Sequence, residues 1–430
     1  MKTKLLLALL FLLQFSNAQN ISFSDANLKS VLLNSPVDYD VNYAVNYPLI
    51  DSNNDNEISQ QEALSVVKLN LAYASISNLE GLQYFTNLKS LLSYNGFFTQ
   101  FDFPSLTNLE ELLFQNVSIG SCPLTLVDFS NHPNLKSLTF SSTITSLDLS
   151  SNVNLDKASI FCPNLTSVNF SNLENLRELN YYGKSPTIDI SDCTNLLSLY
   201  CIGSNSAFTS PEDNKLTSLD LTSQTRLIDL FLSGNKLTSL DLSSCTNLER
   251  IDVSYNQLSE LNLQNVDYAK YFVCSNNQLT SLNVNGMFNL NTLDCSYNQL
   301  VSLSTKNGII EDNLYLFGNT DLAEVCCDEN EIVYLENQLA LNGTYDAEVN
   351  SFCNEETATL RMYPNPISDV LHLDTTDAIT KIELFGVNSL LVMQDESGSN
   401  EVDMSSLEAG IYFLKVYMGD EVSNMKLVKN

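Results

Sequence analysis

A repeat of 21 residues constrains this chain more than any other feature of its sequence. Six asparagines stand 21 residues apart, at Asn214, Asn235, Asn256, Asn277, Asn298 and Asn319. Leucines follow four of them at a fixed distance, at Leu237, Leu258, Leu279 and Leu300. Composition alone would not produce this register, so we predict that each copy is one structural unit, stacked on the next.

The unit has the leucine-rich-repeat pattern, as the segment from Leu248 to Leu263 shows. We expect about twelve short strands with their first inward residues at Leu69, Leu91, Leu112, Leu138, Ala158, Leu179, Leu199, Leu230, Ile251, Phe272, Leu293 and Leu314. This predicts an α/β-type, right-handed solenoid with a parallel concave sheet and inward leucines. The asparagine amides would satisfy backbone groups that the turns bury. The surplus residues at Ile202–Asp213 predict a loop that leaves the solenoid.

Most of the cysteines follow the repeat. Cys162, Cys201, Cys274 and Cys295 fall at inward strand positions, and no CxxC pair exists. We therefore interpret them as small buried residues rather than metal or redox ligands. Cys326 and Cys327 come after the last repeat, and a disulfide from one of them to Cys353 would close the end of the solenoid.

A possible calcium loop precedes the repeats, between Asp51 and Glu62. Oxygen-bearing side chains stand at its positions 1, 3, 5, 9 and 12, and position 7 offers a backbone carbonyl. The predicted ligands are Asp51, Asn53, Asp55, Glu57, Ser59 and Glu62. Asn56 replaces the usual glycine at position 6 and tolerates the left-handed conformation needed there. The loop resembles those of EF-hands and dockerins, although a polar turn with this spacing by chance is the alternative. We expect a structural Ca²⁺ ion that rigidifies a small helical N-terminal cap.

Both ends of the chain carry export signals. Residues 1–18 combine Lys2 and Lys4, an apolar run and a small-residue cleavage site, as in secretory signal peptides. Near the other end, apolar and polar residues alternate, which predicts an antiparallel β-sandwich. Three motifs there, beginning at Tyr363, Val402 and Lys426, resemble the C-terminal sorting domain of type IX secretion cargo. That resemblance implies a Bacteroidetes-type cell, contact with the type IX secretion machinery and delivery outside the cell or to the outer-membrane surface.

Five segments result from these patterns. They are a signal peptide (1–18), an N-terminal cap with the calcium loop (19–66), the leucine-rich repeats (67–325), a C-terminal cap and linker (326–357) and the sorting domain (358–430). The repeats themselves share only a general pattern with bacterial surface leucine-rich-repeat proteins such as internalin-like adhesins.

Composition and motifs favour binding over catalysis. The net charge of −31 argues against general affinity for nucleic acid or anionic membrane. The chain lacks the GxSxG, HExxH, Walker and dinucleotide-binding motifs, and His132 and His372 suit turn or surface positions. We therefore expect no enzyme, although the many carboxylates leave a secreted hydrolase as a weak alternative.

The predicted concave face carries aromatic and acidic side chains that suit protein or glycan recognition in adhesion or adaptor roles. The candidates are Tyr200, Phe231, Asp252, Tyr255, Asp294, Tyr297 and Tyr315. A structural component of the cell envelope or matrix without a discrete ligand is the alternative. No segment after the signal peptide is long and apolar enough to span a membrane.

Overall fold

The computed structural model describes most of the 430 residues. The described ranges are 19–38, 48–72, 75–94, 96–115, 124–203, 216–342, 347–351, 360–363, 367, 369–375, 378–387, 390–419 and 421–429. The predicted signal peptide, Asn214 and Cys353 lie outside them, as does most of the predicted loop after Ile202. The chain forms two compact units, Met1–Asn262 with Val273–Asn277 and Leu263–Phe272 with Gln278–Asn430, and each is described by itself.

Among the described residues, two short helices precede the repeats. Helix α2 (Ala26–Leu33) begins after Asp25, whose side chain accepts hydrogen bonds from the N–H groups of Asn27 and Leu28. Helix α3 (Gln60–Ala63) begins after Ser59 with a reciprocal capping box to Glu62. Leu28 and Leu32 are fully buried, so the apolar face of α2 packs inward.

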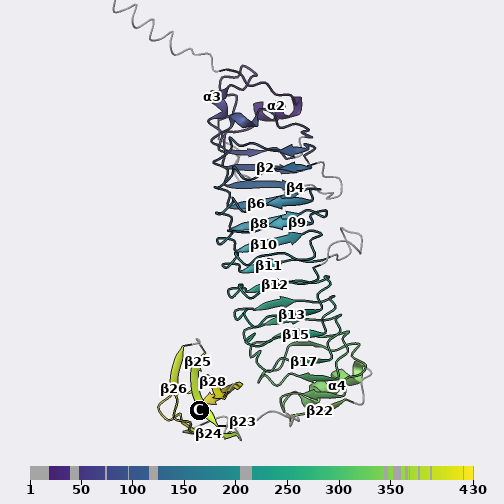
Figure 1. The fold of residues 1–430 in the computed structure, drawn as a ribbon, viewed down its shortest axis with the longest axis vertical. Coiled ribbons are helices and arrows are strands. Elements are labelled where there is room, and N and C mark those ends of the chain that lie inside the picture. The colour runs from purple at the N-terminus through teal and green to yellow at the C-terminus, as the bar shows by residue number, and fades with distance from the viewer. Residues whose placement is uncertain are drawn as a thin grey trace, which may run out of the picture. The chain divides into compact units, whose positions relative to one another are not determined.

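The predicted parallel sheet is confirmed. Its strands follow one another in chain order (Figure 1). They are β1 (Lys68–Asn70), β2 (Ser90–Tyr94), β4 (Glu111–Gln115), β6 (Ser137–Ser141), β8 (Lys157–Phe161), β10 (Glu178–Tyr182), β11 (Ser198–Tyr200), β12 (Asp229–Phe231), β14 (Arg250–Asp252), β16 (Tyr271–Val273), β18 (Thr292–Asp294) and β20 (Asn313–Tyr315). The register is the expected one: Leu199, for example, pairs with both Leu179 and Leu230. The long interval before Leu230 therefore leaves the sheet uninterrupted.

A second series of short parallel strands accompanies the main sheet, one repeat after another. In the first unit these are β3 (Gln100–Phe101) with β5 (Leu126–Val127), β7 (Ser146–Asp148) with β9 (Ser167–Asn169), and β13 (Ser239–Asp241) with β15 (Glu260–Asn262). In the second unit β17 (Ser281–Asn283), β19 (Ser302–Ser304), β21 (Glu324–Cys326) and β22 (Glu348–Asn350) form one sheet. A 3₁₀ turn, η1 (Leu82–Tyr84), lies between the first two repeats. The inward leucines of both series are nearly all buried, so the core runs from repeat to repeat.

The repeat asparagines make the hydrogen bonds that the spacing predicts. Asn256 Nδ2 donates to the carbonyls of Val253 in its own repeat and Leu232 in the preceding one, both at 3.0 Å. Its Oδ1 accepts from Leu237 N at 3.1 Å. Asn277 repeats this pattern with Leu258 N at 2.9 Å. Each amide thus joins neighbouring turns through backbone groups that would otherwise be buried without partners.

The inward cysteines are buried thiols, as expected for apolar positions. Burial raises the pKa of Cys193 and Cys245 to about 12, which keeps them protonated and poorly reactive. Cys326 is disulfide-bonded, whereas Cys327 is a free buried thiol. Cys327 is therefore not the bridging residue, and the pairing of Cys326 with Cys353 stays a prediction.

Helix α4 (Ile332–Asn342) follows the repeats, and the described residues from 360 onward form seven antiparallel strands. One sheet contains β23 (Leu360–Tyr363), β24 (Val370–Thr375) and β27 (Glu401–Asp403). The other contains β26 (Leu391–Asp395), β25 (Ile379–Gly386), β28 (Gly410–Met418) and β29 (Glu421–Lys429). Leu371 and Leu373 of the first sheet share one buried core with Ile382 and Leu414 of the second. This confirms the expected pair of packed antiparallel sheets.

Candidate functional site

A left-handed backbone position precedes each described repeat asparagine from Asn235 to Asn319. It is occupied in turn by Gly234, Tyr255, Asn276, Tyr297 and Gly318, with φ between 53° and 81°. Glycine and asparagine tolerate this conformation, whereas a tyrosine there costs about 1–2 kcal/mol. Tyr255 and Tyr297 are 57% and 59% exposed, so core packing does not compensate for that cost. Two strained, exposed tyrosines therefore need an explanation outside folding.

A first aromatic patch, consisting of Tyr200, Phe231, Asp252 and Tyr255, lies in the first unit. The rings of Tyr200 and Phe231 stack with centroids 4.7 Å apart and planes 3° from parallel. Asp252 is the register partner of Phe231 on the next strand, and its Oδ1 accepts a hydrogen bond from Ser254 N at 3.0 Å. Parallel register places Tyr200, Phe231 and Asp252 on one face of the sheet, and Tyr255 lies in the turn that follows β14.

A second aromatic patch, consisting of Asp294, Tyr297, Tyr315 and Phe317, lies in the second unit. Tyr315 and Phe317 are 42% and 44% exposed, and their rings stack with centroids 6.5 Å apart. Asp294 pairs in register with Tyr315. Phe317 was not among the predicted residues, although its place two residues after Tyr315 puts it on the same sheet face.

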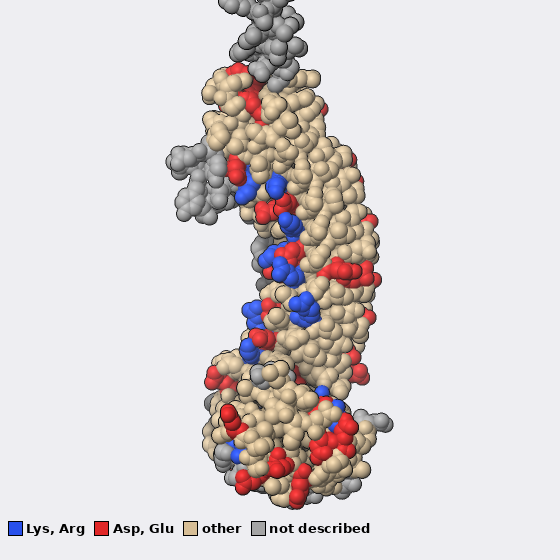
Figure 2. Space-filling view, turned by 90° about the vertical axis from the view of Figure 1, so that its left-hand side faces the viewer, with Lys and Arg blue, Asp and Glu red and all other residues tan. Residues whose placement is uncertain are grey.

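Charged side chains of the first unit gather along a line that runs across the repeats, as Figure 2 shows. Ion pairs link successive repeats: Lys89 and Lys136 both contact Glu110, Lys157 contacts Glu178, Arg177 contacts Asp156, and Arg250 contacts Asp229. Hydrogen bonds from Lys136 and Lys89 lower the pKa of Glu110 to about 2. These cations are paired within the protein, which leaves little unpaired positive charge for an anionic partner.

The predicted calcium loop is held by its own hydrogen bonds. Asp51 accepts from Asp55 N at 3.2 Å and Asn56 N at 3.1 Å, and Asn56 has the left-handed conformation expected, with φ of 62°. Asn53 and Asp55 accept from backbone N–H groups within the loop, and Glu57 pairs with Lys29 at 2.7 Å.

Glu62, the expected bidentate ligand, is nearly buried and accepts four hydrogen bonds. Ser52 donates to one oxygen through its N–H and hydroxyl at 3.0 Å each, and Ser59 does the same to the other at 2.9 Å. Four bonds occupy all the lone pairs of a carboxylate, so calcium would compete with the cap of α3. Among the described residues, no group of three or more His, Cys, Asp or Glu is arranged to hold a metal. Calcium binding stays a prediction.

The two histidines differ from each other in environment. His132 is 1% exposed and lies against the rings of Phe101 and Phe129, so its expected turn position is a buried one. Burial lowers the pKa of His132, which keeps the ring neutral. His372 of β24 lies 3.3 Å from Glu401 of β27 and is partly exposed.

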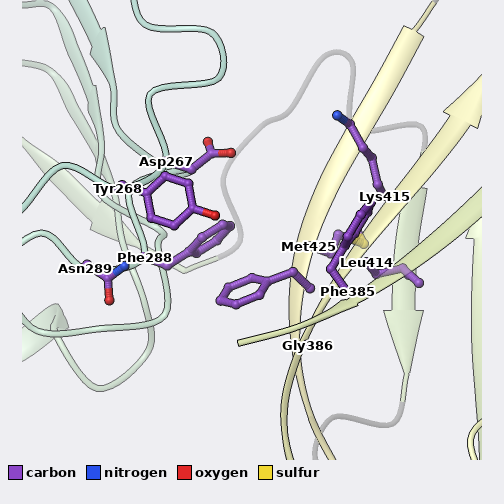
Figure 3. A pocket seen from close by; sticks show the side chains of 10 residues that line it. Asp267, Tyr268, Phe288, Asn289, Phe385, Gly386, Leu414, Lys415 and Met425 are labelled. Atoms are coloured by element: carbon purple, nitrogen blue, oxygen red, sulfur yellow. The ribbon is translucent and has the colours of Figure 1, made fainter. Parts of the chain in front are cut away.

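A pocket in the second unit is shown in Figure 3. Its charged residues are Asp267 and Lys415, and Phe288 and Phe413 contribute aromatic rings with centroids 5.1 Å apart. Burial raises the pKa of Asp267 against the opposing influence of Lys415.

Comparison with known proteins identifies the end of the chain. Residues 361–430 match the model of the secretion system C-terminal sorting domain. These residues are a type IX secretion sorting domain. The protein is therefore directed to the outer surface or the extracellular space, and the domain implies interaction with the secretion machinery. In the part of the chain that the structure describes, no helix is long and apolar enough to cross a membrane.

Solved structures resemble the chain only distantly, and no curated protein matches its sequence. The functional domain of InlJ from Listeria monocytogenes is 20% identical, with 87% of this chain and 93% of that one covered and a TM-score of 0.44. An internalin, InlF, from the same organism is 18% identical, with 77% and 96% covered and a TM-score of 0.40. A complex of TLR13 with ssRNA13 is 15% identical, with 63% of this chain and 41% of that one covered and a TM-score of 0.45. The assignment of the repeats therefore rests on this chain's own strand register and asparagine hydrogen bonds.

Proposed function

We propose that the protein is a non-catalytic recognition protein, delivered outside the cell, that binds a protein or glycan through the exposed face of its parallel sheet. The observation that carries this proposal is the pair of strained, exposed tyrosines, Tyr255 and Tyr297. Since strain without burial weakens the fold, its retention is typical of a binding surface. Stacked rings and carboxylates on the same face add the mixture of aromatic and polar groups that recognition surfaces use.

A binding screen tests this proposal. The secreted full-length chain would be applied to arrays of extracellular proteins and glycans, beside the variants Tyr255→Asn and Tyr297→Asn. Asparagine already occupies the same turn at Asn276, so both variants are expected to fold. Saturable binding that a variant weakens supports recognition. Binding by no array member, with circular dichroism showing a folded chain, would instead favour the structural envelope or matrix role.

A further inference from the structure

The second aromatic patch places exposed rings beside the carboxylate of Asp294, which forms no ion pair with any residue that the structure describes. Asp294 is the register partner of Tyr315, so the carboxylate and the ring occupy neighbouring strands on one face. Asp294 Oδ1 accepts from Ser296 N at 3.0 Å, which fixes the side chain beside the ring. Within the described residues, Asp294 takes part in no ion pair.

A cation, Arg250, lies beside the first aromatic patch, where it pairs with Asp229 rather than with Asp252. Arg250 lies two residues before Asp252 on the same strand and therefore on the same face. Its Nη2 lies 2.6 Å from Asp229, its register partner. In the second patch the equivalent residues are Thr292 before Asp294 and Asn313 before Tyr315, and both are neutral.

The rings of the second patch are held in place before any partner arrives. Gly318 provides the space for the Tyr297 ring, because a Cβ at Gly318 would lie 2.5 Å from Tyr297 Cδ1. Tyr315 and Phe317 stack on each other with planes 25° apart. Preorganised rings lose little conformational freedom on binding, which favours affinity.

We propose that the second aromatic patch binds a lysine or arginine side chain of a basic protein segment. This rests on the proposed function, in which the sheet face is a recognition surface. The face of an aromatic ring attracts a cation within about 6 Å of its centroid, and Asp294 supplies the opposite charge beside it. The net charge of −31 draws basic segments toward the protein over roughly 10 Å at 0.1 M salt. An anionic partner would be repelled, and a neutral glycan would gain nothing from the charge of Asp294.

The test measures binding of a peptide probe to the full-length chain by biolayer interferometry. The probe is a twelve-residue peptide with four arginines separated by Gly-Ser, beside a peptide in which glutamines replace the arginines. The variants are Asp294→Asn, Tyr297→Asn and Tyr315→Val. The replacing residues at positions 297 and 315 are the ones that the chain itself has at the matching repeat positions, Asn276 and Val273. Asp321→Asn is the control, because it removes one exposed negative charge of the same unit outside the patch.

We expect the arginine peptide to bind and the glutamine peptide not to bind. Asp294→Asn should weaken binding about ten-fold and each tyrosine variant about five-fold. Asp321→Asn should change it less than two-fold, and 0.5 M NaCl should weaken binding strongly. Equal losses in Asp294→Asn and Asp321→Asn would mean general attraction to an acidic protein and would overturn the proposal.

The outcome for neutral ligands separates this inference from the proposed function. Binding of a neutral glycan or the glutamine peptide that depends on Tyr315 but not on Asp294 would overturn the cationic partner and leave recognition in place. Failure of the arginine peptide to bind, together with an array hit that Tyr255→Asn weakens, would also overturn only this inference. Failure of every probe and every array member would contradict both.

Discussion

Buried carboxylates at the two ends of the repeat region differ in how many hydrogen bonds they accept. Before the first repeat, Asp25 is 7% exposed and accepts from the N–H groups of Asn27, Leu28, Ser77 and Asn78 and from the Ser77 hydroxyl. Burial alone would raise the pKa of Asp25, but these donors outweigh it and lower the pKa to about 2. The charge of Asp25 therefore ties α2 to the turn at Ser77.

On either side of β20 in the sequence, two other buried carboxylates have too few donors to outweigh burial. Glu311 and Glu331 are 2% and 0% exposed. Asn307 Nδ2 donates to one oxygen of Glu311 at 2.7 Å, and Asp328 N donates to one oxygen of Glu331 at 3.1 Å. The other oxygens, Glu311 Oε2 and Glu331 Oε1, have no donor among the described residues. A proton shared between the two carboxyl groups would satisfy both.

The pKa values of this pair follow from burial and from its acidic neighbours. Burial and the adjacent Glu311 raise the pKa of Glu331 to about 8, and burial raises the pKa of Glu311 as well. The charge of Asp328 raises the pKa of both Glu331 and Glu311, although the hydrogen bond from Asp328 N lowers that of Glu331. Lys306 in turn lowers the pKa of Asp328. Burial makes an ionised carboxylate unfavourable at both ends, and the number of donors decides whether the charge is retained.

The repeat asparagines lie between these two ends, and Asn256 is a polar side chain whose hydrogen bonds are all made. Asn256→Ala would leave the N–H of Leu237 and the carbonyls of Leu232, Val253 and Ser254 without this partner. We expect a loss of about 4 kcal/mol in the free energy of unfolding, measured by urea denaturation at pH 6. Asn247→Ala, an exposed asparagine with one bond to Thr225 O, should lose less than about 1 kcal/mol. Equal midpoints for wild type and Asn256→Ala would contradict the role assigned to the asparagines.

Glu331→Gln tests whether a proton shared by Glu311 and Glu331 stabilises the C-terminal end of the repeat region. The glutamine amide can donate to Glu311 Oε2 at any pH, whereas the wild-type pair needs a proton. The pKa of Glu331 in the folded chain lies above the unfolded value of about 4.3. The stabilisation that its proton contributes is therefore fully present at pH 4 and declines as pH rises toward 8. We expect the variant to be more stable by about 3 kcal/mol at pH 7 and unchanged at pH 4. Denaturation at both pH values measures this.

Glu336→Gln serves as the control for that prediction, since Glu336 is exposed on α4, which begins directly after Glu331. It should leave the dependence of stability on pH as it is in the wild type. The same dependence on pH in Glu331→Gln and in wild type would rule out the shared proton.

Asp25→Asn should have the opposite dependence on pH at the N-terminal end. A folded pKa of about 2 lies below the unfolded value of about 3.9, so the stabilisation is present above pH 4 and is lost as pH falls toward 2. We expect the variant to lose about 2 kcal/mol at pH 7 and almost nothing at pH 2, measured by denaturation. The exposed Asp321→Asn is the control. A loss of the same size at both pH values would show that hydrogen-bond geometry, rather than charge, stabilises this end.

Added calcium should change the free energy of unfolding less than Asn256→Ala, Glu331→Gln or Asp25→Asn does. If the loop from Asp51 to Glu62 binds calcium as its sequence predicts, a calcium concentration five times Kd stabilises the chain by about 1 kcal/mol. Calorimetric titration with millimolar calcium should give heat for the wild type and none for Asp51→Asn. Absence of heat for the wild type would mean that the hydrogen bonds of Glu62 already complete the loop.

The repeat and its register could be predicted from the amino-acid sequence alone. A period of 21 residues with inward leucines predicts stacked repeats, because each repeat must cover the apolar strand of its neighbour. The residues that pair in the sheet, such as Leu199 and Leu230, are the expected ones. The sequence also indicated the asparagine hydrogen bonds and the buried cysteines, because each depends on the repeat spacing, while the sorting domain was expected from the resemblance of its motifs to a known family.

The hydrogen-bond partners of the individual buried polar groups were seen only in the three-dimensional structure. The donors to Asp25 at Ser77 and Asn78 are more than 50 residues away in sequence, and His132 is enclosed by rings from other turns. The left-handed backbone at Tyr255 and Tyr297 likewise became visible only in three dimensions. The physical reason is the same throughout: the repeat period determines which residues face inward, whereas hydrogen bonds and charges depend on neighbours brought together by packing of separate turns.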